Sequence, residues 1–271
     1  MRKVLLVTGG SRGIGAATCI LAAQKGWDVA VNYSANAQAA DSVVEQIKAA
    51  GGRAISVQAD VAHEEQNARL VREARQLAGR IDLFFANAGV GLGTDLASSE
   101  TDWSTSFDVN VHSHRWAAKY LMPEWLVAGQ GYFASTASAA GVLAQIGSAP
   151  YSVTKHAAVA FAEWLSITYG SRGIKVSCLC PQGVNTAMLR GGDRQGIDAN
   201  AGNVVRVAGA VLEPAQVADV VHDALVEERF FIFPHPEVGD YVKIKATEHE
   251  RWLGGMRKLP KFQPQDVPIQ D

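Results

Sequence analysis

Residues 3–15, KVLLVTGGSRGIG, contain a short apolar run that leads directly into a glycine-rich turn. The run has the length of a buried β-strand, and the helix-forming stretch ATCILAAQKG, residues 17–26, follows the turn. Glycines at such a turn let a pyrophosphate approach the backbone, and the next helix offers N–H groups and a positive dipole end. Although glycine also marks turns that bind no ligand, this strand–turn–helix context predicts a dinucleotide site. Its spacing is T-G-x-x-x-G-x-G rather than the general G-x-G-x-x-G.

Strand and helix patterns alternate along the rest of the chain. Apolar runs of strand length occur at residues 3–8, 27–33, 53–60, 81–89, 131–136, 174–182 and 229–235. Helix-forming segments separate them, and such regular alternation is typical of a parallel sheet covered by helices. We therefore predict one α/β domain over residues 1–271. It should be a Rossmann-type, doubly wound sheet of seven parallel strands with helices on both faces.

The composition is that of a globular protein with a full core, since 48% of the 271 residues are hydrophobic and 19% are charged. A net charge of −2 provides no basic surplus for nucleic acid. No apolar run approaches the roughly 18 residues of a membrane span, and the apolar start is too short for a signal peptide. We expect a cytoplasmic protein that binds neither nucleic acid nor membrane.

Three cysteines, Cys19, Cys178 and Cys180, lie in apolar contexts and are predicted to be buried free thiols. We expect Cys178 and Cys180, which alternate along a strand, to point to opposite faces and so not to share a metal. No His, Cys, Asp and Glu cluster has the spacing of metal ligands, and we therefore predict no catalytic metal.

A second informative stretch is residues 137–155, ASAAGVLAQIGSAPYSVTK. Tyr151 and Lys155 are four residues apart and would share one face of a helix, while Ser138 follows an apolar strand. A phenol has an unperturbed pKa of about 10, and a nearby ammonium favours its phenolate form. A phenol, an ammonium and a hydroxyl can together move a proton between a carbonyl and an alcohol. A lone Tyr-x-x-x-Lys pair is more often a solvated surface pair, so this hypothesis depends on a bound cofactor.

The end of the second strand bears on which cofactor is used. An acid at this position would bind the ribose 2′-hydroxyl of NAD, but the chain has Asn32, Tyr33 and Ser34 there, and Asp28 lies at the other end of the strand. Arg12, in the glycine turn, could pair with a 2′-phosphate, or could be a plain surface residue. NADP(H) is therefore favoured, and NAD(H) remains possible.

Several motifs occur together in this chain. They are TGGSRGIG at residues 8–15, Asn87-Ala88-Gly89 after the fourth strand, Asn110 in a helical region, and Ser138, Tyr151 and Lys155. With this set, the chain resembles the short-chain dehydrogenase/reductase family in its shorter single-domain branch, over residues 3 to about 233.

The resemblance implies a role for each matching residue. Tyr151 would be the general acid in carbonyl reduction and the base in alcohol oxidation. Lys155 would lower the pKa of Tyr151 and bind the nicotinamide ribose, and Ser138 would orient the substrate oxygen. Asn110 would support a water that relays protons to Lys155. The expected cofactor contacts, from the motifs and the resemblance together, are Gly9, Ser11, Arg12, Gly13, Ile14, Gly15, Asn32, Tyr33, Ser34, Asp60, Val61, Asn87, Ala88, Gly89, Tyr151, Lys155, Pro181, Gly183, Val184 and Thr186.

Two positions depart from the family pattern. Ala86 stands where many members have another Asn. The loop after the sixth strand begins Pro181-Gln182-Gly183, whereas the family loop begins Pro-Gly. We expect cofactor binding to survive this shift, while the shape of the loop, and with it the substrate fit, can change.

The substrate pocket is expected to be apolar. Its predicted lining is Val90, Leu92, Val142, Leu143, Ile146, Met188 and Leu189, with Arg190 as the candidate to bind an acid. An insertion at residues 184–212, Gly-rich and polar over 190–203, is predicted to form a substrate lid or a plain surface loop. The C-terminal tail, residues 236–271, is expected to contain one more helix. It could cap the pocket, pack on a partner subunit or cover the sheet edge.

These observations predict an NAD(P)(H)-dependent alcohol dehydrogenase or carbonyl reductase for a small-molecule ketone or secondary alcohol, apolar or aromatic. One alternative is a reductase of 3-ketoacyl thioesters on an acyl carrier, which the segment at residues 32–52 resembles. Another is a nucleotide-sensing protein without turnover, because fold alone does not determine function. From the family resemblance we expect a homodimer or homotetramer packed through helices near residues 101–127 and 151–170.

Overall fold

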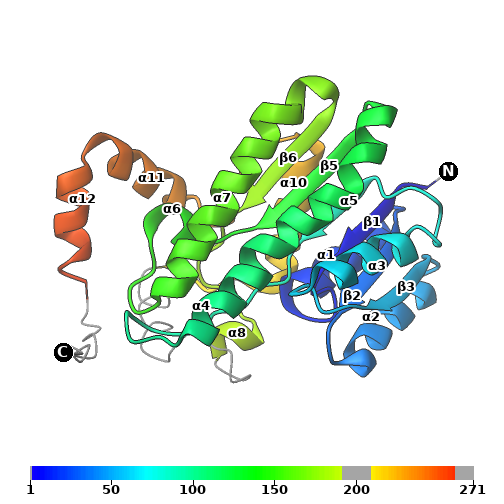
Figure 1. Ribbon diagram of the computed structural model, residues 1–271, viewed down its shortest axis with the longest axis horizontal. Helices are drawn as coiled ribbons and strands as arrows, with labels where there is room; N and C mark the ends of the chain where they lie inside the picture. The colour runs from blue at the N-terminus through cyan, green and yellow to red at the C-terminus, as the bar shows by residue number, and fades with distance from the viewer. Residues whose placement is uncertain (1, 191–208, 260–271) are drawn as a thin grey trace.

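A computed structural model describes residues 2–190 and 209–259, and Figure 1 shows one twisted sheet with helices on either side. The seven strands are all parallel and lie in the order β3-β2-β1-β4-β5-β6-β7. The strands are β1 Val4–Val7, β2 Asp28–Tyr33, β3 Ala54–Gln58, β4 Leu83–Ala86, β5 Gly131–Thr136, β6 Ile174–Leu179 and β7 Phe231–Ile232. The predicted doubly wound fold is confirmed.

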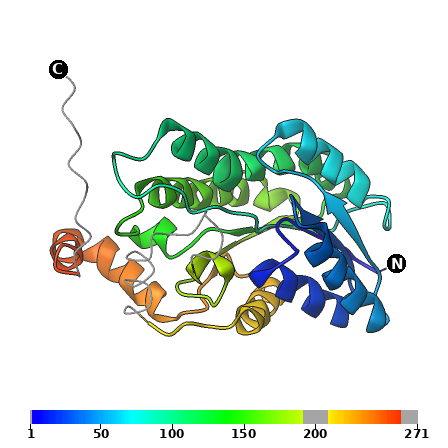
Figure 2. The ribbon, with the colours of Figure 1, turned by 90° about the horizontal axis from the view of Figure 1, so that it is seen from below.

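The helices form two layers, one on each face of the sheet, as Figure 2 shows. One layer holds α1 Gly13–Gln24, α2 Ala37–Ala49 and α10 Pro214–Val226. The other holds α3 Glu64–Ala74, α4 Glu100–Phe107, α5 Ser113–Ala128 and α7 Ala149–Tyr169. Shorter helices are α6 Ala140–Leu143 and α8 Ala187–Arg190, and the tail forms α11 Glu237–Thr247 and α12 His249–Met256.

Strand β1 shows why its apolar run is continuous. Val4 and Leu6 pack into the core beneath α3, α5 and α7, whereas Leu5 and Val7 pack into the core beneath α1 and α2. Side chains of a strand alternate between its faces, and a sheet covered on both faces needs apolar residues on both. All four positions of β1 are accordingly apolar and buried.

Several elements differ in detail from the sequence-based expectation. The expected seventh strand at residues 229–235 is reduced to Phe231–Ile232, and the short helix α6 was not predicted. The tail holds two helices rather than one, because the chain bends at Glu248, whose φ and ψ are −133° and 55°. Residues 191–208, the greater part of the predicted lid, and residues 260–271 lie outside the described residues. No helix within the described ranges combines the length and apolarity needed to cross a membrane.

Candidate active site

A cavity of about 1340 Å³ runs along the carboxyl ends of the strands, from the glycine turn after β1 to the C-terminal helices. Parallel doubly wound sheets bind ligands at this edge. Small-molecule pockets commonly measure about 300–1,000 Å³, so this cavity has room for a cofactor and a substrate together. Predicted site residues that line it are Gly9, Ser11, Arg12, Gly13, Ile14, Tyr33, Ser34, Asp60, Val61, Asn87, Ala88, Gly89, Ser138, Tyr151, Lys155, Pro181, Val184 and Thr186.

The glycine turn has the backbone geometry of a phosphate cradle. Gly9 and Gly13 have φ of +61° and +56°, values that residues with a Cβ rarely adopt. A Cβ added at Gly15 would lie 2.3 Å from the Gly9 carbonyl oxygen, so the turn and α1 pack too closely for any side chain there. Arg12 is the N-cap residue of α1, and its side chain makes no capping hydrogen bond to this helix. The first N–H groups of this helix can therefore receive an anion, and the residues present fit a dinucleotide.

Asn32 contributes to the site through the glycine turn rather than as a lining residue. Its side chain is buried, accepts a bond from Gly9 N at 3.2 Å and donates to Val57 O and Ala59 O at 3.2 and 3.0 Å. These bonds occupy the side-chain amide and Asn32 does not line the cavity, so the direct cofactor contact expected of Asn32 stays a prediction. The adjoining Tyr33 and Ser34 do line the cavity.

The segment after β4, Asn87-Ala88-Gly89, lines the cavity. Asn87 Nδ2 donates to Thr8 O at 3.0 Å and to Gly9 O at 3.3 Å, which ties this segment to the glycine turn. A Cβ at Gly89 would lie 3.2 Å from both Asn110 Oδ1 and Lys155 Nζ. Gly89 therefore lets the backbone pass close to the predicted catalytic groups.

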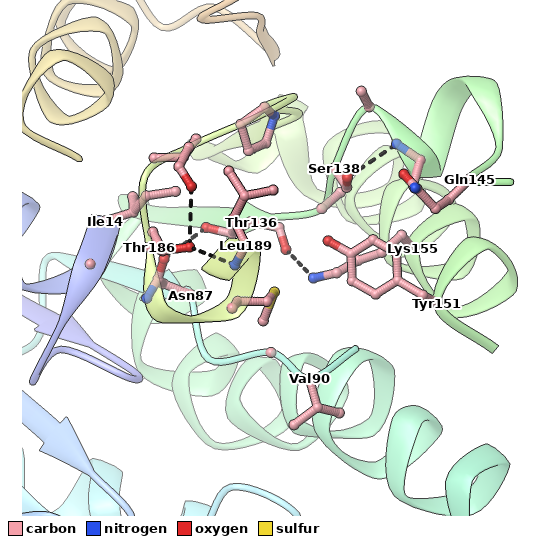
Figure 3. Close-up of a pocket in the computed structure, with 18 of the residues that line it drawn as sticks. Ile14, Asn87, Val90, Thr136, Ser138, Gln145, Tyr151, Lys155, Thr186 and Leu189 are labelled. Carbon is pink, nitrogen blue, oxygen red and sulfur yellow. Dashed lines mark hydrogen bonds between the residues drawn. The ribbon is translucent and has the colours of Figure 1, made fainter. Parts of the chain in front are cut away.

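Tyr151, Lys155 and Ser138 come together on one wall of the cavity, as Figure 3 shows. Tyr151 and Lys155 lie one turn apart on α7, and Lys155 Nζ is 5.5 Å from the Tyr151 ring centroid. Lys155 Nζ donates to Thr136 O at 2.9 Å, at the end of β5. All three are buried, so the solvated surface pair considered above is excluded.

Burial changes the acidity of both groups on α7. It raises the pKa of Tyr151, and a hydrogen bond with Ser138 lowers this pKa in part. Lys155 is not among the groups that shift this pKa, so the lowering by Lys155 that the family resemblance implied stays a prediction. Burial also lowers the pKa of Lys155 to about 8. The phenol is therefore held in its protonated form, which suits a proton donor.

Asn110 lies behind the cavity wall in a π-helical turn, Asp108–His112, between α4 and α5. The side chain is fully buried; its Oδ1 accepts from Val90 N and its Nδ2 donates to Val90 O, both at 2.9 Å. Nδ2 also donates to Thr154 Oγ1 at 3.1 Å. The amide thus fastens the segment after β4 to α7. A π-turn inside an α-helix is often found at functional sites.

The cysteine prediction needs a correction. Cys178 Sγ and Cys180 Sγ lie 3.9 Å apart, on the same side, because residues two apart in a strand face the same way. All three cysteines are buried free thiols, as expected. Within the described residues no group of three or more His, Cys, Asp or Glu side chains could hold a metal ion.

His114 is a polar residue that the sequence did not single out. It is buried beside the ring of Phe133, and neither ring nitrogen has a hydrogen-bond partner among the described residues. Burial, and to a lesser extent Lys155, lowers the pKa of His114 to about 3. His114 is therefore neutral and adds no charge beneath Lys155.

The loop after β6 keeps its place against the cavity despite its unusual start. Gln182 lines the cavity, and its backbone N–H donates to His235 Nδ1 at 3.2 Å. Thr186 reaches the glycine turn, since a Cβ at Gly13 would lie 3.1 Å from Thr186 Cγ2. Predicted cofactor residues outside the lining, among those described, are Gly15, Asn32 and Gly183.

The apolar pocket prediction holds for most positions. Val90, Leu143, Ile146, Met188 and Leu189 line the cavity, whereas Leu92 and Val142 pack against the core. Arg190 does not line it and donates to Asn185 Oδ1 at 2.5 Å. Lining residues that the sequence did not indicate include Thr136, Gln145, Tyr241, Ile244, Arg251, Trp252, Met256 and Leu259. Thr136, two residues before Ser138, could have been found from its place at the end of β5.

Comparison with known proteins agrees with this geometry. The family model described as short chain dehydrogenase matches residues 3–195. A 3-oxoacyl-[acyl-carrier-protein] reductase of Synechocystis sp. is 35% identical over 187 residues, 69% of this chain and 76% of the relative. A cyclohexanol dehydrogenase of Acinetobacter sp. is 30% identical over 235 residues, 85% of this chain and 90% of the relative. The chain therefore belongs to the short-chain dehydrogenase family of oxidoreductases.

Solved structures share the whole architecture. A short chain dehydrogenase/reductase from Burkholderia phymatum in complex with NAD has a TM-score of 0.83 at 27% identity, over 97% of this chain and 98% of that chain. A short-chain dehydrogenase from Sphingobium yanoikuyae in complex with NADPH has a TM-score of 0.78 at 21% identity, over 97% and 99% of the two chains. The second likeness concerns the fold alone.

Proposed function

We propose that this protein is an NADP(H)-preferring carbonyl reductase or alcohol dehydrogenase acting on apolar or aromatic ketones and the matching secondary alcohols. The observation that carries the proposal is one continuous cavity. It joins the glycine turn to a wall on which Tyr151, Lys155 and Ser138 meet. A dinucleotide held at the turn would extend toward that wall.

The side chains perform the positioning and the proton transfer. The bound nicotinamide supplies or accepts the hydride. Ser138 and Tyr151 hold the substrate oxygen, and Tyr151 donates its phenolic proton to that oxygen during reduction. The raised pKa of Tyr151 keeps this proton in place until it is needed. Lys155, whose Nζ donates to Thr136 O, would bind the ribose of the cofactor.

The preference for NADP(H) rests on Ser34, which follows β2, and on Arg12 in the glycine turn. Ser34 and Arg12 both line the nucleotide end of the cavity. An uncharged Ser34 does not repel a 2′-phosphate, and a guanidinium can bind a phosphate through two parallel hydrogen bonds. The only acid of β2, Asp28, is engaged with Arg53 at 3.3 Å at the opposite end of the strand. NAD(H) remains the second candidate cofactor.

A second candidate substrate is a 3-ketoacyl thioester. The similarity to the Synechocystis 3-oxoacyl-[acyl-carrier-protein] reductase favours it, while the cyclohexanol dehydrogenase, which aligns over more of this chain, favours a cyclic alcohol or ketone. The apolar lining from Val90, Leu143 and Ile146 supports the ketone.

The deciding experiment follows the oxidation of NADPH, and separately of NADH, with cyclic ketones, aromatic ketones and a 3-ketoacyl thioester. Tyr151→Phe is the control, because it removes the proton and keeps the ring. We expect ketone turnover with NADPH, and a kcat about 10²-fold or more lower in the variant, as for loss of a general acid. NADPH binding, measured by fluorescence, should be unchanged. Turnover equal in both proteins would reject the mechanism. Cofactor binding without turnover on any substrate would favour the sensing protein.

A further inference from the structure

The C-terminal arm, residues 237–259, lies at the substrate end of the cavity. It comprises α11, α12 and the turn that follows, and Figures 1 and 2 show it extending beyond α6, away from the sheet. The arm residues that line the cavity with side chains are Tyr241, Ile244, Arg251, Trp252, Met256 and Leu259. Five of these six carry large apolar or aromatic groups, so the arm supplies an apolar wall.

A small apolar cluster docks the base of the arm on α6. Val238 of α11 is fully buried against Ala139 and Leu143, and Trp252 of α12 packs at the edge of this cluster. Leu143 also lines the cavity. One set of contacts therefore joins the arm to the pocket wall beside Ser138.

Lys245 adds a polar link between the arm and the rest of the pocket. Its Nζ donates to Val142 O in α6 at 2.6 Å and lies 3.4 Å from His156 Nε2 in α7. The same ammonium lies 5.3 Å from the Trp252 ring centroid, within the range of a cation–π contact. Lys245 thus contacts α6, α7 and α12 at once.

The link continues from His156 to the cavity. His156 Nδ1 is 2.8 Å from Ser152 O, so this nitrogen carries the proton and Nε2 can accept from Lys245. Ser152 Oγ accepts from Gln145 N at 2.7 Å and donates to Gln145 O at 3.1 Å. Gln145 lines the cavity, and His156 directly follows Lys155. The arm is therefore connected to the helix that carries the proposed proton donor.

We propose that the C-terminal arm is the substrate-selecting wall of this pocket, with Trp252 as the contact residue and Lys245 as a positioning residue. It selects ketones in which the carbonyl carbon is a member of a bulky apolar ring system or is attached to one. This inference rests on the proposed function and specifies its substrate. Arg251 is paired with Glu248 at 2.6 Å, so the wall presents its aromatic and aliphatic groups rather than a free cation.

The test compares a bulky ketone, 1-tetralone, with a small one, cyclopentanone, in the full chain with NADPH. Trp252→Ala should raise KM for 1-tetralone about tenfold, the size of effect expected when a ring contact of about 1.4 kcal/mol is lost. KM for cyclopentanone, KM for NADPH and kcat should change less than about twofold. Leu253→Ala is the matched control, since Leu253 neighbours Trp252 on α12 without lining the cavity.

Lys245 is tested by a conservative pair of variants. Lys245→Met keeps the aliphatic stem and removes the ammonium, and it should raise KM for 1-tetralone with little change in kcat. Lys245→Arg retains the positive charge and should restore KM in large part. A purely stabilising role would instead lower the melting temperature in both variants without this split between KM and kcat.

Calorimetry of 1-tetralone binding to the protein saturated with NADP⁺ distinguishes the proposed function from the proposed substrate-selecting wall. A wild-type protein that turns over no ketone rejects the proposed function. If such a protein still binds 1-tetralone more tightly than Trp252→Ala does, the selecting wall stands. Equal binding or equal KM in wild type, Trp252→Ala and Leu253→Ala, or no binding by wild type, overturns the inference.

Discussion

At the scale of single residues, the ammonium group of Lys155 is buried in the wall of the candidate site. Lys155 is 2% exposed and donates to the carbonyl of Thr136. One hydrogen bond compensates only part of the free energy of hydration that a charged amine loses on burial. This cost lowers the pKa of Lys155 from 10.5 to about 8. A positioning residue of the site is therefore also a source of instability near neutral pH.

The lowered pKa of Lys155 predicts a pH-dependent gain in stability. Between about pH 8 and 10.5 the unfolded chain keeps a proton that the folded protein has lost, so the free energy of unfolding rises with pH in this window. Below pH 8 the full cost of the buried charge is present. Lys155→Met removes this cost, and its stability relative to wild type should be greater at pH 7 than at pH 10. Urea unfolding of both proteins at the two pH values measures the difference.

Lys48→Met provides the control for the loss of one positive charge, because Lys48 is an exposed residue of α2. Its stability relative to wild type should stay nearly constant from pH 7 to pH 10. Parallel pH curves for wild type and Lys155→Met would contradict the assignment of the cost to Lys155.

At the scale of elements, the short helix α6 is held against α7 by a close backbone approach. A Cβ added at Gly141 would lie 2.5 Å from the carbonyl oxygen of Lys155. The contact brings Ser138 and Leu143, on either side of Gly141, beside the helix that carries Tyr151. The distance between α6 and α7 therefore determines how far Ser138 and Leu143 lie from Tyr151.

Gly141→Ala is expected to force the two helices apart. Overpacking of this kind costs about 1–3 kcal/mol of stability, and KM for the ketone should rise because Leu143 moves with α6. Gly254→Ala in α12 is the matched control: a Cβ there meets nothing within 4 Å, and Ala is the better helix former by up to about 1 kcal/mol. Urea midpoints measure the effect, and equal midpoints for the two variants would refute close packing at Gly141.

At the scale of the whole molecule, apolar side chains on α5 and α7 remain uncovered within a single chain. Val127 of α5, Trp164 and Ile167 of α7 are 92%, 52% and 83% exposed. Figure 1 shows these two helices lying next to each other on one face. We propose that a second copy of the chain covers this face, as a homodimer or as part of a homotetramer.

Combining Trp164→Glu with Ile167→Glu is expected to reduce the mass in solution to that of one chain, 28.9 kDa, because two buried charges would oppose assembly. Light scattering coupled to size exclusion measures the mass. Val226→Glu, at a position of α10 that is 69% exposed, controls for an added surface charge and should leave the oligomer intact. A monomeric wild type, or an unchanged mass in the double variant, would rule out this interface.

Local features of the sequence predicted much of the fold and the site. The alternation of apolar runs and helical segments depends on residues a few positions apart, and it correctly predicted all seven strands of the parallel sheet. The four-residue spacing of Tyr151 and Lys155 likewise placed both on one face of α7. Strand length was less well predicted for β7, because pairing with β6 covers only Phe231 and Ile232.

The sequence by itself determined the architecture and the pairing of Tyr151 with Lys155, since periodicity and short spacing are properties of the local chain. Tertiary structure alone decided that the bonds of Asn32 go to the glycine turn and to the residues around β3. It also decided that the C-terminal arm lines one end of the cavity. That arrangement depends on contacts such as Lys245 with Val142, 103 residues apart, and no local pattern specifies which distant groups will meet when the chain packs.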